Sequence, residues 1–461
     1  ELSQAGTTKT SVHIKTEWDF SKIYKGITDP QLEKDVVLID KTYTEFAKKY
    51  SGAAPKYTTD IKALKTALDD WSSLIEKTGI FKPLWYLHLL QDIDTENNKI
   101  KALFNTYHER LVKSSNQVMF FNLELAKITP DNQKKFLKDA SLVPYNTFLK
   151  EIFENAKYNL SEAEEKLLSI KHAPSHSMWV DAQKKLLTSQ TVKHKGKLIP
   201  ITEASAIKGD LPIKERRALH AEKKKKYREI SFLAEAELNA VVSNKRTTDE
   251  LRGFTKPYEA TVLSYQNSIA SVESLVEAVT KRFPDSQRFF KLKAKVLRLP
   301  KLTLAEIGTS MAKSAKKYTL DEGVQIVYDA FSKIKPEFAE MFMNFLKEGR
   351  FDIYPKKGKR NGAYCSSGTG VPTYIMLNHV DDTNSVSTMA HEMGHAIHFE
   401  LSKSQPALYS DFSISIAEVA STFFENVLFD YQYNRAESKK EKLNMLLERI
   451  QDDVFTTHAQ I

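Results

Sequence analysis

The sequence predicts a mainly helical protein, and three observations carry this prediction. Gly and Pro number only 15 each among 461 residues, so long stretches of chain lack the residues that end helices. Between them, apolar residues recur at every third or fourth position, which is the period of an amphipathic helix. The composition, with 41% hydrophobic and 28% charged residues, is typical of a globular protein and gives no sign of disorder. We therefore expect long helices arranged in two or three sub-domains.

The first elements predicted along the chain are helices that pair as hairpins. Apolar spacing and polar starts indicate helices over residues 29–50, 60–79, 94–128 and 129–158. After them, the alternating pattern TVKHKGKLIPI at residues 191–201 turns at Lys195 and Gly196, which predicts a β-hairpin. We place a boundary at this hairpin, between an amino-terminal helical lobe of residues 1–190 and a second domain of residues 191–461.

Helical patterns return over residues 212–347, and we expect them to break near the prolines. These prolines are Pro257, Pro284, Pro300 and Pro336. Residues 350–378 differ in composition from the helical stretches. They are rich in Gly, Ser and Pro and carry β-forming residues such as Ile353, Tyr364 and Ile375. This segment predicts two or three short strands that form a small sheet directly before the next helix.

That next helix carries the most informative motif of the chain. The segment SVSTMAHEMGHAIHFEL, residues 385–401, contains HExxH as His391, Glu392 and His395. At about 100° per residue, the two histidines lie one turn apart on one helix face, so both rings can reach a single tetrahedral metal at ~2.0 to 2.1 Å. Glu392 lies beside that face, where its carboxylate can act as the general base that activates water. The motif therefore predicts one Zn²⁺ ion and hydrolytic chemistry.

A third metal ligand is needed, and four carboxylates follow the motif. Glu400 lies about 140° around the helix from His395 and points away, while Asp411 is typical of a cap or a loop. Glu418 begins a helical run with apolar neighbours, where a buried carboxylate without a cation would be costly, so we expect it to be the third ligand. Glu425 falls two turns later and is either an acceptor for a ligand histidine N–H or an ordinary surface carboxylate.

Two further side chains near the motif have alternative interpretations. The longer metzincin motif would require Gly at position 398 and His at position 401, but the chain has His398 and Leu401, so that class is excluded. His398 either helps to bind a substrate or is a core histidine with its own hydrogen bonds. Cys365, the single cysteine, excludes an internal disulfide and is interpreted as a small buried side chain rather than an inhibitory thiol.

Charge and hydropathy bear on partners and location. The formal charge is +9, but Lys and Arg are interleaved with Glu and Asp along the whole chain, which indicates solvated helix faces and no nucleic-acid partner. No apolar run approaches the 18 residues of a membrane span, so we expect no membrane association. We expect a cytoplasmic protein, although the chain opens at Glu1 without an initiator Met, which leaves a removed export signal open.

Four sequence blocks carry a family resemblance. GKRNGAYC at residues 358–365, PTYIMLN at 372–378, TMAHEMGHAIH at 388–398 and AEVASTFFE at 417–425 resemble oligoendopeptidase F, within the thimet oligopeptidase superfamily. The resemblance implies a two-lobed helical metallopeptidase with a deep channel that cleaves internal bonds of short peptides. It places the zinc ligands on His391, His395 and Glu418 and the base on Glu392, as the motif analysis does. It also implies that the strand at residues 372–378, which includes Tyr374, is the edge to which a substrate backbone adds.

Alternatives remain beside this interpretation. A helical metallocarboxypeptidase would share the metal site but needs a cationic anchor for the substrate carboxylate, and a non-catalytic zinc- or peptide-binding protein would need a closed site with four protein ligands. The family also supplies Tyr and His groups from a later segment, whereas this chain ends at Ile461 within an amphipathic run. We therefore expect the carboxy-terminal end to be missing, and a carboxy-terminal segment or a further chain to complete the active site.

Overall fold

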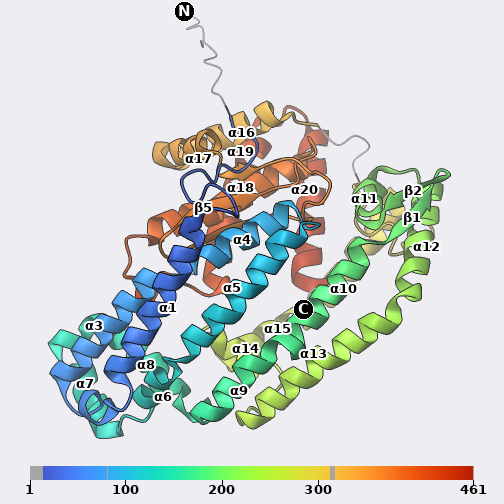
Figure 1. The fold of residues 1–461 in the computed structure, drawn as a ribbon. Coiled ribbons are helices and arrows are strands. Elements are labelled where there is room, and N and C mark those ends of the chain that lie inside the picture. Colours follow the sequence, from blue (N-terminus) through green and yellow to red (C-terminus); the bar gives the residue numbers. More distant parts are fainter. Residues whose placement is uncertain (1–13, 80, 312–316, 460–461) are drawn as a thin grey trace, which may run out of the picture. The chain divides into compact units, whose positions relative to one another are not determined.

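The structure is a computed structural model that describes residues 14–79, 81–311 and 317–459. It is mainly helical, with two small sheets, which confirms the predicted fold class (Figure 1). Its Cα atoms group into two compact units, each of which is described by itself below. Unit 1 comprises residues 1–46, 69–114 and 316–435, and unit 2 comprises residues 47–68, 115–315 and 436–461.

Unit 1 contains the predicted metal helix and the strands that precede it. Its elements are α1 (Pro30–Tyr50), α3 (Ile61–Thr78), α4 (Lys82–Ile93), α5 (Asn98–Asn116), α16 (Leu320–Ile334), α17 (Pro336–Glu348), β3 (Phe351–Asp352), β4 (Tyr364–Gly368), β5 (Val371–Met376), α18 (Thr383–Ser402) and α19 (Ile414–Arg435), with a 3-10 turn at Ala407–Tyr409. Helices α1, α3 and α5 have some of their residues outside the unit 1 ranges.

Local sequence signals explain the helix limits in this unit. Thr319 and Glu322 form a capping box at the start of α16, so two of its free backbone N–H groups are hydrogen-bonded. Pro336 occupies the first turn of α17, and Gly349 ends that helix in the left-handed conformation at φ 68°. The Asp382 carboxylate caps α18 by accepting the Ser385 N–H at 2.7 Å.

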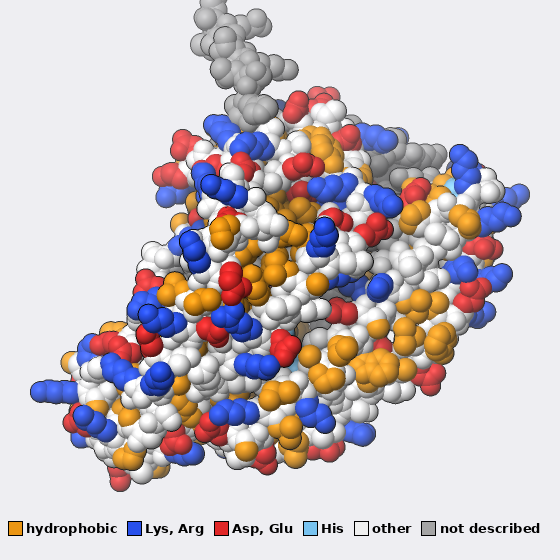
Figure 2. All heavy atoms as spheres, viewed as in Figure 1, with side chains coloured by type: hydrophobic (Ala, Val, Ile, Leu, Met, Phe, Trp, Pro, Cys, Tyr) orange, Lys and Arg blue, Asp and Glu red, His pale blue; other side chains and the backbone are white. Residues whose placement is uncertain are grey.

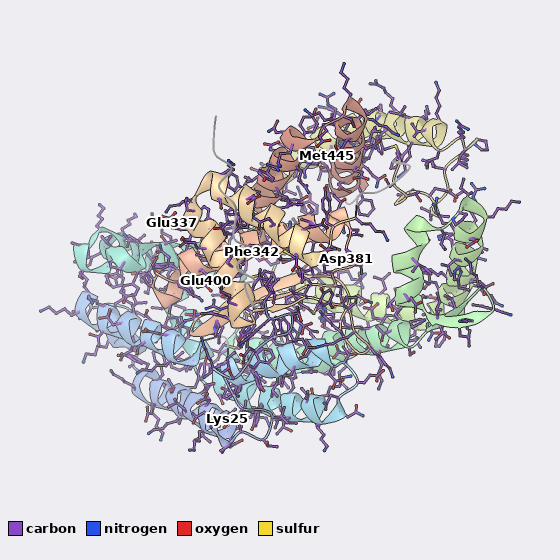
Figure 3. The ribbon with its side chains drawn as sticks, turned by 90° about the horizontal axis from the view of Figure 1, so that it is seen from above. Lys25, Glu337, Phe342, Asp381, Glu400 and Met445 are labelled. Carbon is purple, nitrogen blue, oxygen red and sulfur yellow. The ribbon has the colours of Figure 1, made fainter. Side chains whose placement is uncertain are left out.

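The core of unit 1 lies between α16, α17, α18, α19 and the sheet. Phe331, Phe342 and Phe351 are all fully buried there, and Phe424 of α19 packs against Phe331 with ring centroids 4.7 Å apart. Phe342, labelled in Figure 3, lies on α17 in the middle of this cluster. The core therefore holds both metal-site helices against the same apolar layer.

The sheet of unit 1 has the strand order β3-β5-β4, with β3 parallel and β4 antiparallel to β5. This confirms the prediction of two or three short strands before the metal helix. It corrects the expectation that residues 372–378 form the edge, because β5 lies in the middle and β4 is an edge strand. The pairing of β4 with β5 is regular from Tyr364 to Ser366 and is then interrupted by a bulge before Gly368.

The segment before α1 is bound to this sheet. Trp18 donates its indole N–H to the carbonyl oxygen of Ile375 at 2.9 Å, and Tyr374 donates its hydroxyl to the carbonyl oxygen of Asp19 at 2.7 Å. The backbone N–H of Ile353 also donates to the carbonyl oxygen of Thr16 at 2.9 Å. The segment that contains Thr16, Trp18 and Asp19 is thus hydrogen-bonded to the sheet of unit 1, although it lies far from that sheet in the sequence.

Unit 2 consists of helices and one hairpin. Its elements are α2 (Ala54–Tyr57), α6 (Met119–Ala126), α7 (Pro130–Lys138), α8 (Asn146–Asn155), α9 (Glu162–His172), α10 (Met178–Thr188), β1 (Thr191–His194), β2 (Lys197–Pro200), α11 (Ile201–Ile207), α12 (Ile213–Glu229), α13 (Ser231–Leu251), α14 (Glu259–Ser264), α15 (Ile269–Val296) and α20 (Lys439–Asp453). Short 3-10 or π turns occupy Ala140–Tyr145, Ala156–Tyr158, Ala173–Ser177, Lys208–Asp210 and Val454–Ala459.

The predicted hairpin is confirmed, with β1 and β2 antiparallel around Lys195 and Gly196, both at positive φ. The predicted helix break at Pro284 is wrong, because α15 continues through this residue. Proline removes its own N–H and crowds the carbonyl four residues earlier, but this 28-residue helix continues on both sides of Pro284. The boundary between residues 190 and 191 stays a prediction, since the two units are defined by contacts and each draws on several chain segments.

Helices α4, α9 and α10 lie outside the ranges that the sequence pattern predicted, and α4 has a clear physical reason for this. Its side chains are buried on all sides rather than along one stripe, so the helical period is absent from the pattern of apolar residues. Pro83 stands at its start, where proline is tolerated but reads as a loop signal. Among the described residues no helix is both long enough and apolar enough to cross a membrane. On the face shown in Figure 2, basic and acidic side chains are interspersed.

Candidate metal centre

The site lies where α18 and α19 of unit 1 pack against each other (Figure 1). Their close approach depends on Gly394, which stands between the two histidines of the motif. A Cβ at this position would lie 2.9 Å from the carbonyl oxygen of Ala420, 2.9 Å from the Cα of Ser421 and 3.2 Å from the Cβ of Phe424. A glycine is therefore required for α19 to come this near, and this approach carries Glu418 to the histidines.

The three predicted ligands converge. Glu418 Oε2 lies 3.4 Å from His391 Nε2 and 3.6 Å from His395 Nε2, and the three donor atoms all lie within 4.8 Å of one another. Ligands held ~2.0 to 2.1 Å from a tetrahedral ion are roughly 3.3 Å apart, close to these separations. The Glu418 side chain is 47% exposed, so the site is open on one side.

Groups around the triad fix the orientation of each ligand. His391 Nδ1 lies 3.2 Å from Glu425 Oε2, and the backbone of Ala417 lies close enough to the His395 ring to favour its charged form. The contact with Glu425 occupies Nδ1 of His391, and Nε2 of both rings lies near Glu418 Oε2. The buried Ser421 hydroxyl donates to Glu418 Oε2 at 2.7 Å.

The same surroundings shift the pKa values of the two histidines in opposite directions. Burial lowers the pKa of His391, but the hydrogen bond with Glu425 and the nearby carboxylates outweigh burial and raise it. Burial lowers the pKa of His395, although the charge of Glu418 acts against this shift. The raised pKa of His391 therefore reflects the carboxylates held close to its ring, and the lowered pKa of His395 reflects the burial of its ring.

Glu392 is 6% exposed and lies between α18 and the strand β4. Burial and the charge of Glu418 raise the pKa of its carboxyl to about 7, although His391 and a hydrogen bond from the Cys365 backbone N–H act to lower it. A carboxylate with a pKa near neutrality is suited to accept a proton and release it again.

The remaining predicted residues lie as follows. Tyr374 is 3% exposed and points into an aromatic cluster with Trp18, away from solvent, with its hydroxyl bonded to the chain before α1. His398 stacks on Phe412 with ring centroids 4.0 Å apart, and its Nδ1 is buried without a hydrogen-bond partner among the described residues. The Cys365 thiol is half-buried and packs against the unit 1 core.

The carboxylates rejected as ligands are occupied elsewhere. Glu400, labelled in Figure 3, pairs with Arg350 at 3.1 Å and with Lys403 at 2.7 Å. Asp411 is exposed and accepts a backbone N–H of its own loop. Three groups at the site were not predicted from the sequence: Gly394, Ser421 and the backbone N–H of Cys365. Of these, only Ser421 could have been found, because it lies three residues after Glu418 on the same helix face.

The donor set fits zinc. Two neutral imidazole nitrogens and one carboxylate oxygen are ligands that zinc prefers, and three protein ligands with an open side are typical of catalytic zinc sites. Among the residues that the structure describes, His391, His395 and Glu418 form the one group of three or more His, Cys, Asp or Glu side chains close enough together to hold a metal ion. An HExxH helix with a glutamate from the next helix is the site pattern of a class of metallopeptidases, and this helical protein has that pattern.

Comparisons with known proteins agree with this class. The family model for peptidase family M3 matches residues 216–461, and the model for oligopeptidase F matches residues 124–188. The chain therefore belongs to peptidase family M3, and it is a peptidase of the oligoendopeptidase F group. Oligopeptidase PepF of Bacillus subtilis is 25% identical over 97% of this chain and 67% of its own length. Group B oligopeptidase PepB of Streptococcus agalactiae is 24% identical over 97% of this chain and 75% of its own length.

Solved structures share the fold. The crystal structure of oligoendopeptidase F from Enterococcus faecium matches with a TM-score of 0.65 at 18% identity, covering 93% of this chain and 72% of that chain. The structure of PZ peptidase A with an inhibitor matches with a TM-score of 0.67 at 13% identity, covering 95% and 75%. The mainly helical fold of this chain is thus the fold of this group of peptidases.

Proposed function

We propose that the protein is a zinc-dependent endopeptidase that hydrolyses internal bonds of short peptides with Glu392 as the general base. The observation that carries the proposal is the convergence of His391, His395 and Glu418 within 4.8 Å beside a buried carboxylate whose pKa is raised to about 7. Membership of a peptidase family that includes oligopeptidases supports the substrate class.

The metal site would be held by His391 and His395 through Nε2 and by the Glu418 carboxylate. When bound, zinc supplies Lewis-acid polarisation of the scissile carbonyl and of the attacking water. Glu425 and the Ala417 backbone hold the two rings in place, and Ser421 holds the Glu418 carboxylate. These partners keep each ligand in one orientation, which reduces the cost of organising the site when a metal binds.

Glu392 transfers a proton from water to the leaving nitrogen. Its carboxylate accepts a proton from water as the water oxygen forms a bond to the scissile carbonyl carbon, and it then gives this proton to the leaving nitrogen as the C–N bond breaks. The base is regenerated at the end of the cycle, so one water is consumed and no other reactant is needed. The burial that raises the pKa of Glu392 to about 7 favours both proton transfers near neutral pH.

The outer edge of β4 provides a place for an extended peptide. β4 pairs with β5 on one side, and on the other side the N–H of Cys365 reaches Glu392. A substrate backbone that pairs with this edge would pass directly in front of the general base. We therefore assign the substrate edge to β4 in place of residues 372–378.

Product analysis tests the proposal. A pool of random peptides is incubated with the protein, with and without a metal chelator, and products are identified by mass spectrometry. We expect internal cuts that vanish on chelation and return with zinc. Cleavage that persists after complete metal removal would refute the proposal, and loss of all cleavage when substrates are amidated at the carboxyl end would instead identify a carboxypeptidase.

Two variants test the residue roles. Glu392→Gln keeps the shape of the side chain but removes the base, so zinc should remain bound while turnover is lost. Glu418→Ala removes one of three ligands, so zinc content measured by mass spectrometry of metals should fall. Turnover in the first variant, or full zinc occupancy in the second, would contradict the assignment.

A further inference from the structure

Helix α4 contacts the strand that faces the general base. Trp85 of α4 is 4% exposed and donates its indole N–H to the Ser366 hydroxyl at 2.9 Å. Asp92, at the other end of α4, is 3% exposed and accepts the Tyr364 hydroxyl at 2.9 Å. Both partners belong to β4, and one residue, Cys365, separates them.

The alternation of a strand gives these two bonds a defined direction. Side chains at positions 364 and 366 share one face of β4, and the side chain at 365 points to the other. The first face meets α4, whereas Cys365 packs on the core cluster that includes α18 residues. The strand is therefore held through Tyr364 and Ser366 on one face, while the backbone of Cys365, between them, lies close to the Glu392 carboxyl.

The backbone ladder of β4 is short, although side-chain contacts such as the Ser367–Thr373 hydroxyl bond at 2.9 Å add to it. The ladder with β5 is regular over three pairs, Tyr364↔Met376, Cys365↔Ile375 and Ser366↔Tyr374, and is irregular beyond Ser366. The two side-chain bonds to α4 fall on the first and third of these pairs. An edge strand with so short a ladder is among the first elements to open locally, so two part-buried side-chain bonds to α4 limit its motion.

The buried carboxylate of Asp92 is itself held in place. It accepts an N–H of the Arg360 guanidinium at 3.2 Å, and the Asp92 carbonyl oxygen accepts the Arg360 backbone N–H at 2.7 Å. Two residues before Arg360, the carbonyl oxygen of Gly358 accepts both the backbone N–H and the hydroxyl of Thr95, at 2.7 and 2.8 Å. The end of α4 and the chain that leads into β4 thus form one hydrogen-bonded connection.

We infer that Trp85 and Asp92 are positioning residues for peptide hydrolysis, which fix the outer edge of β4 relative to Glu392 through Ser366 and Tyr364. The inference rests on the proposed function, because it assigns a role to the strand edge that meets the substrate. Neither residue contacts the metal triad, so both act through β4. A displacement of a reacting group by about 1 Å can lower a rate about 100-fold, so a loosened edge is expected to affect turnover.

Two conservative variants and one matched control test the inference. Tyr364→Phe removes the hydroxyl that Asp92 accepts, and Trp85→Phe removes the indole N–H that Ser366 accepts. The control is Tyr24→Phe, because Tyr24 is also 3% exposed and donates its hydroxyl to a carboxylate, that of Asp35, at 2.6 Å. The three variants remove the same kind of part-buried bond from unit 1, but only two of them touch β4.

The measurements are kcat and KM on one peptide, zinc content, and amide hydrogen exchange of residues 364–368. In Tyr364→Phe and Trp85→Phe we expect exchange in β4 to rise about tenfold and kcat/KM to fall about 10- to 100-fold, with unchanged zinc content. KM should rise together with the fall in kcat, because the edge also binds the peptide. A simple loss of folded protein would lower kcat alone. Tyr24→Phe should keep kcat/KM within about twofold of the unsubstituted protein.

The opposite results overturn the inference. It fails if the two β4 variants keep kcat/KM within twofold, if β4 exchange is unchanged, or if Tyr24→Phe loses as much activity as they do. A failure of the proposed function is recognised separately, because the unsubstituted protein would then cleave no peptide in a chelator-sensitive way. In that case the positioning role of Trp85 and Asp92 is refuted as well.

Discussion

Gly394→Ala offers a sharp test of how the site is assembled. The added Cβ would lie 2.9 Å from both the Ala420 oxygen and the Ser421 Cα, whereas unstrained contacts between carbon atoms begin near ~3.5 Å. Relief of this overlap requires α19 to move by roughly 0.5 Å away from α18. Protein–metal distances tolerate only about 0.2 Å, so Glu418 would leave its position relative to the histidines.

The expected magnitudes follow from this displacement. Overpacking in a tight core costs about 1 to 3 kcal/mol of unfolding free energy. Zinc affinity should fall about 10- to 100-fold, the range found when the support of a metal ligand is lost. Affinity is measured by competition with a zinc-binding dye and stability by urea unfolding. If Gly394→Ala binds zinc as tightly as the unsubstituted protein, the close approach of α19 is not what sets the ligand geometry.

Gly323→Ala is a matched control. Gly323 lies in α16, and a Cβ there would meet the side chain of Val386 of α18 at 3.1 Å, which is a longer contact than at Gly394 and involves no backbone atom. Both substitutions gain about 1 kcal/mol of helix propensity, so this gain cancels in the comparison. We expect Gly323→Ala to keep its zinc affinity and to change the unfolding free energy by less than about 1 kcal/mol.

Three further outcomes are expected. Ser421→Ala removes the hydroxyl that holds the Glu418 carboxylate at 2.7 Å, and the same dye competition should show zinc affinity about tenfold weaker; an unchanged affinity would remove Ser421 from the site. A protonated Glu392 accepts no proton, so kcat/KM should fall as the pH drops through the pKa of this carboxyl, which a bound zinc ion holds below the metal-free value of about 7; kcat/KM that stays constant down to about pH 4 would argue against this base. In unit 2, burial raises the pKa of the fully buried Glu306 carboxyl, but hydrogen bonds led by that from Arg217 outweigh burial and lower it from 4.5 to about 2. Its stabilisation is therefore present above about pH 4.5 and lost as the pH falls through 2, so urea unfolding should show Glu306→Gln less stable by about 2 to 3 kcal/mol at pH 7 and equally stable near pH 2.

The sequence predicted the parts of the site that one helix determines. His391, His395 and Glu392 share α18, so helix geometry alone relates them, and Glu418 was found by eliminating its neighbours. The role of Gly394 was not predicted, because it depends on the packing of α19 on α18. A glycine inside a motif carries no signal about which backbone will approach it.

The fold shows the same division between local and distant causes. Regular apolar spacing predicted α1 and the hairpin at residues 191–201, because each depends on its own residues. Helix α4 was missed because it is buried all round and lacks the helical period. The substrate edge was misplaced because strand order in a sheet does not follow chain order, and the parallel strand β3 takes the side of β5 that would otherwise be open.

The hydrogen bond from Trp18 to Ile375 has a consequence for how the protein is made. The two residues are 357 positions apart in the chain. At a synthesis rate of roughly 5 to 20 residues per second, Trp18 leaves the ribosome about 20 to 70 s before its partner exists. Phe20 and Tyr24 pack on Tyr86, which follows them closely in the chain, but Trp18 lacks its hydrogen-bond acceptor until β5 has been made. Unit 1 therefore cannot complete its fold in the order of its synthesis.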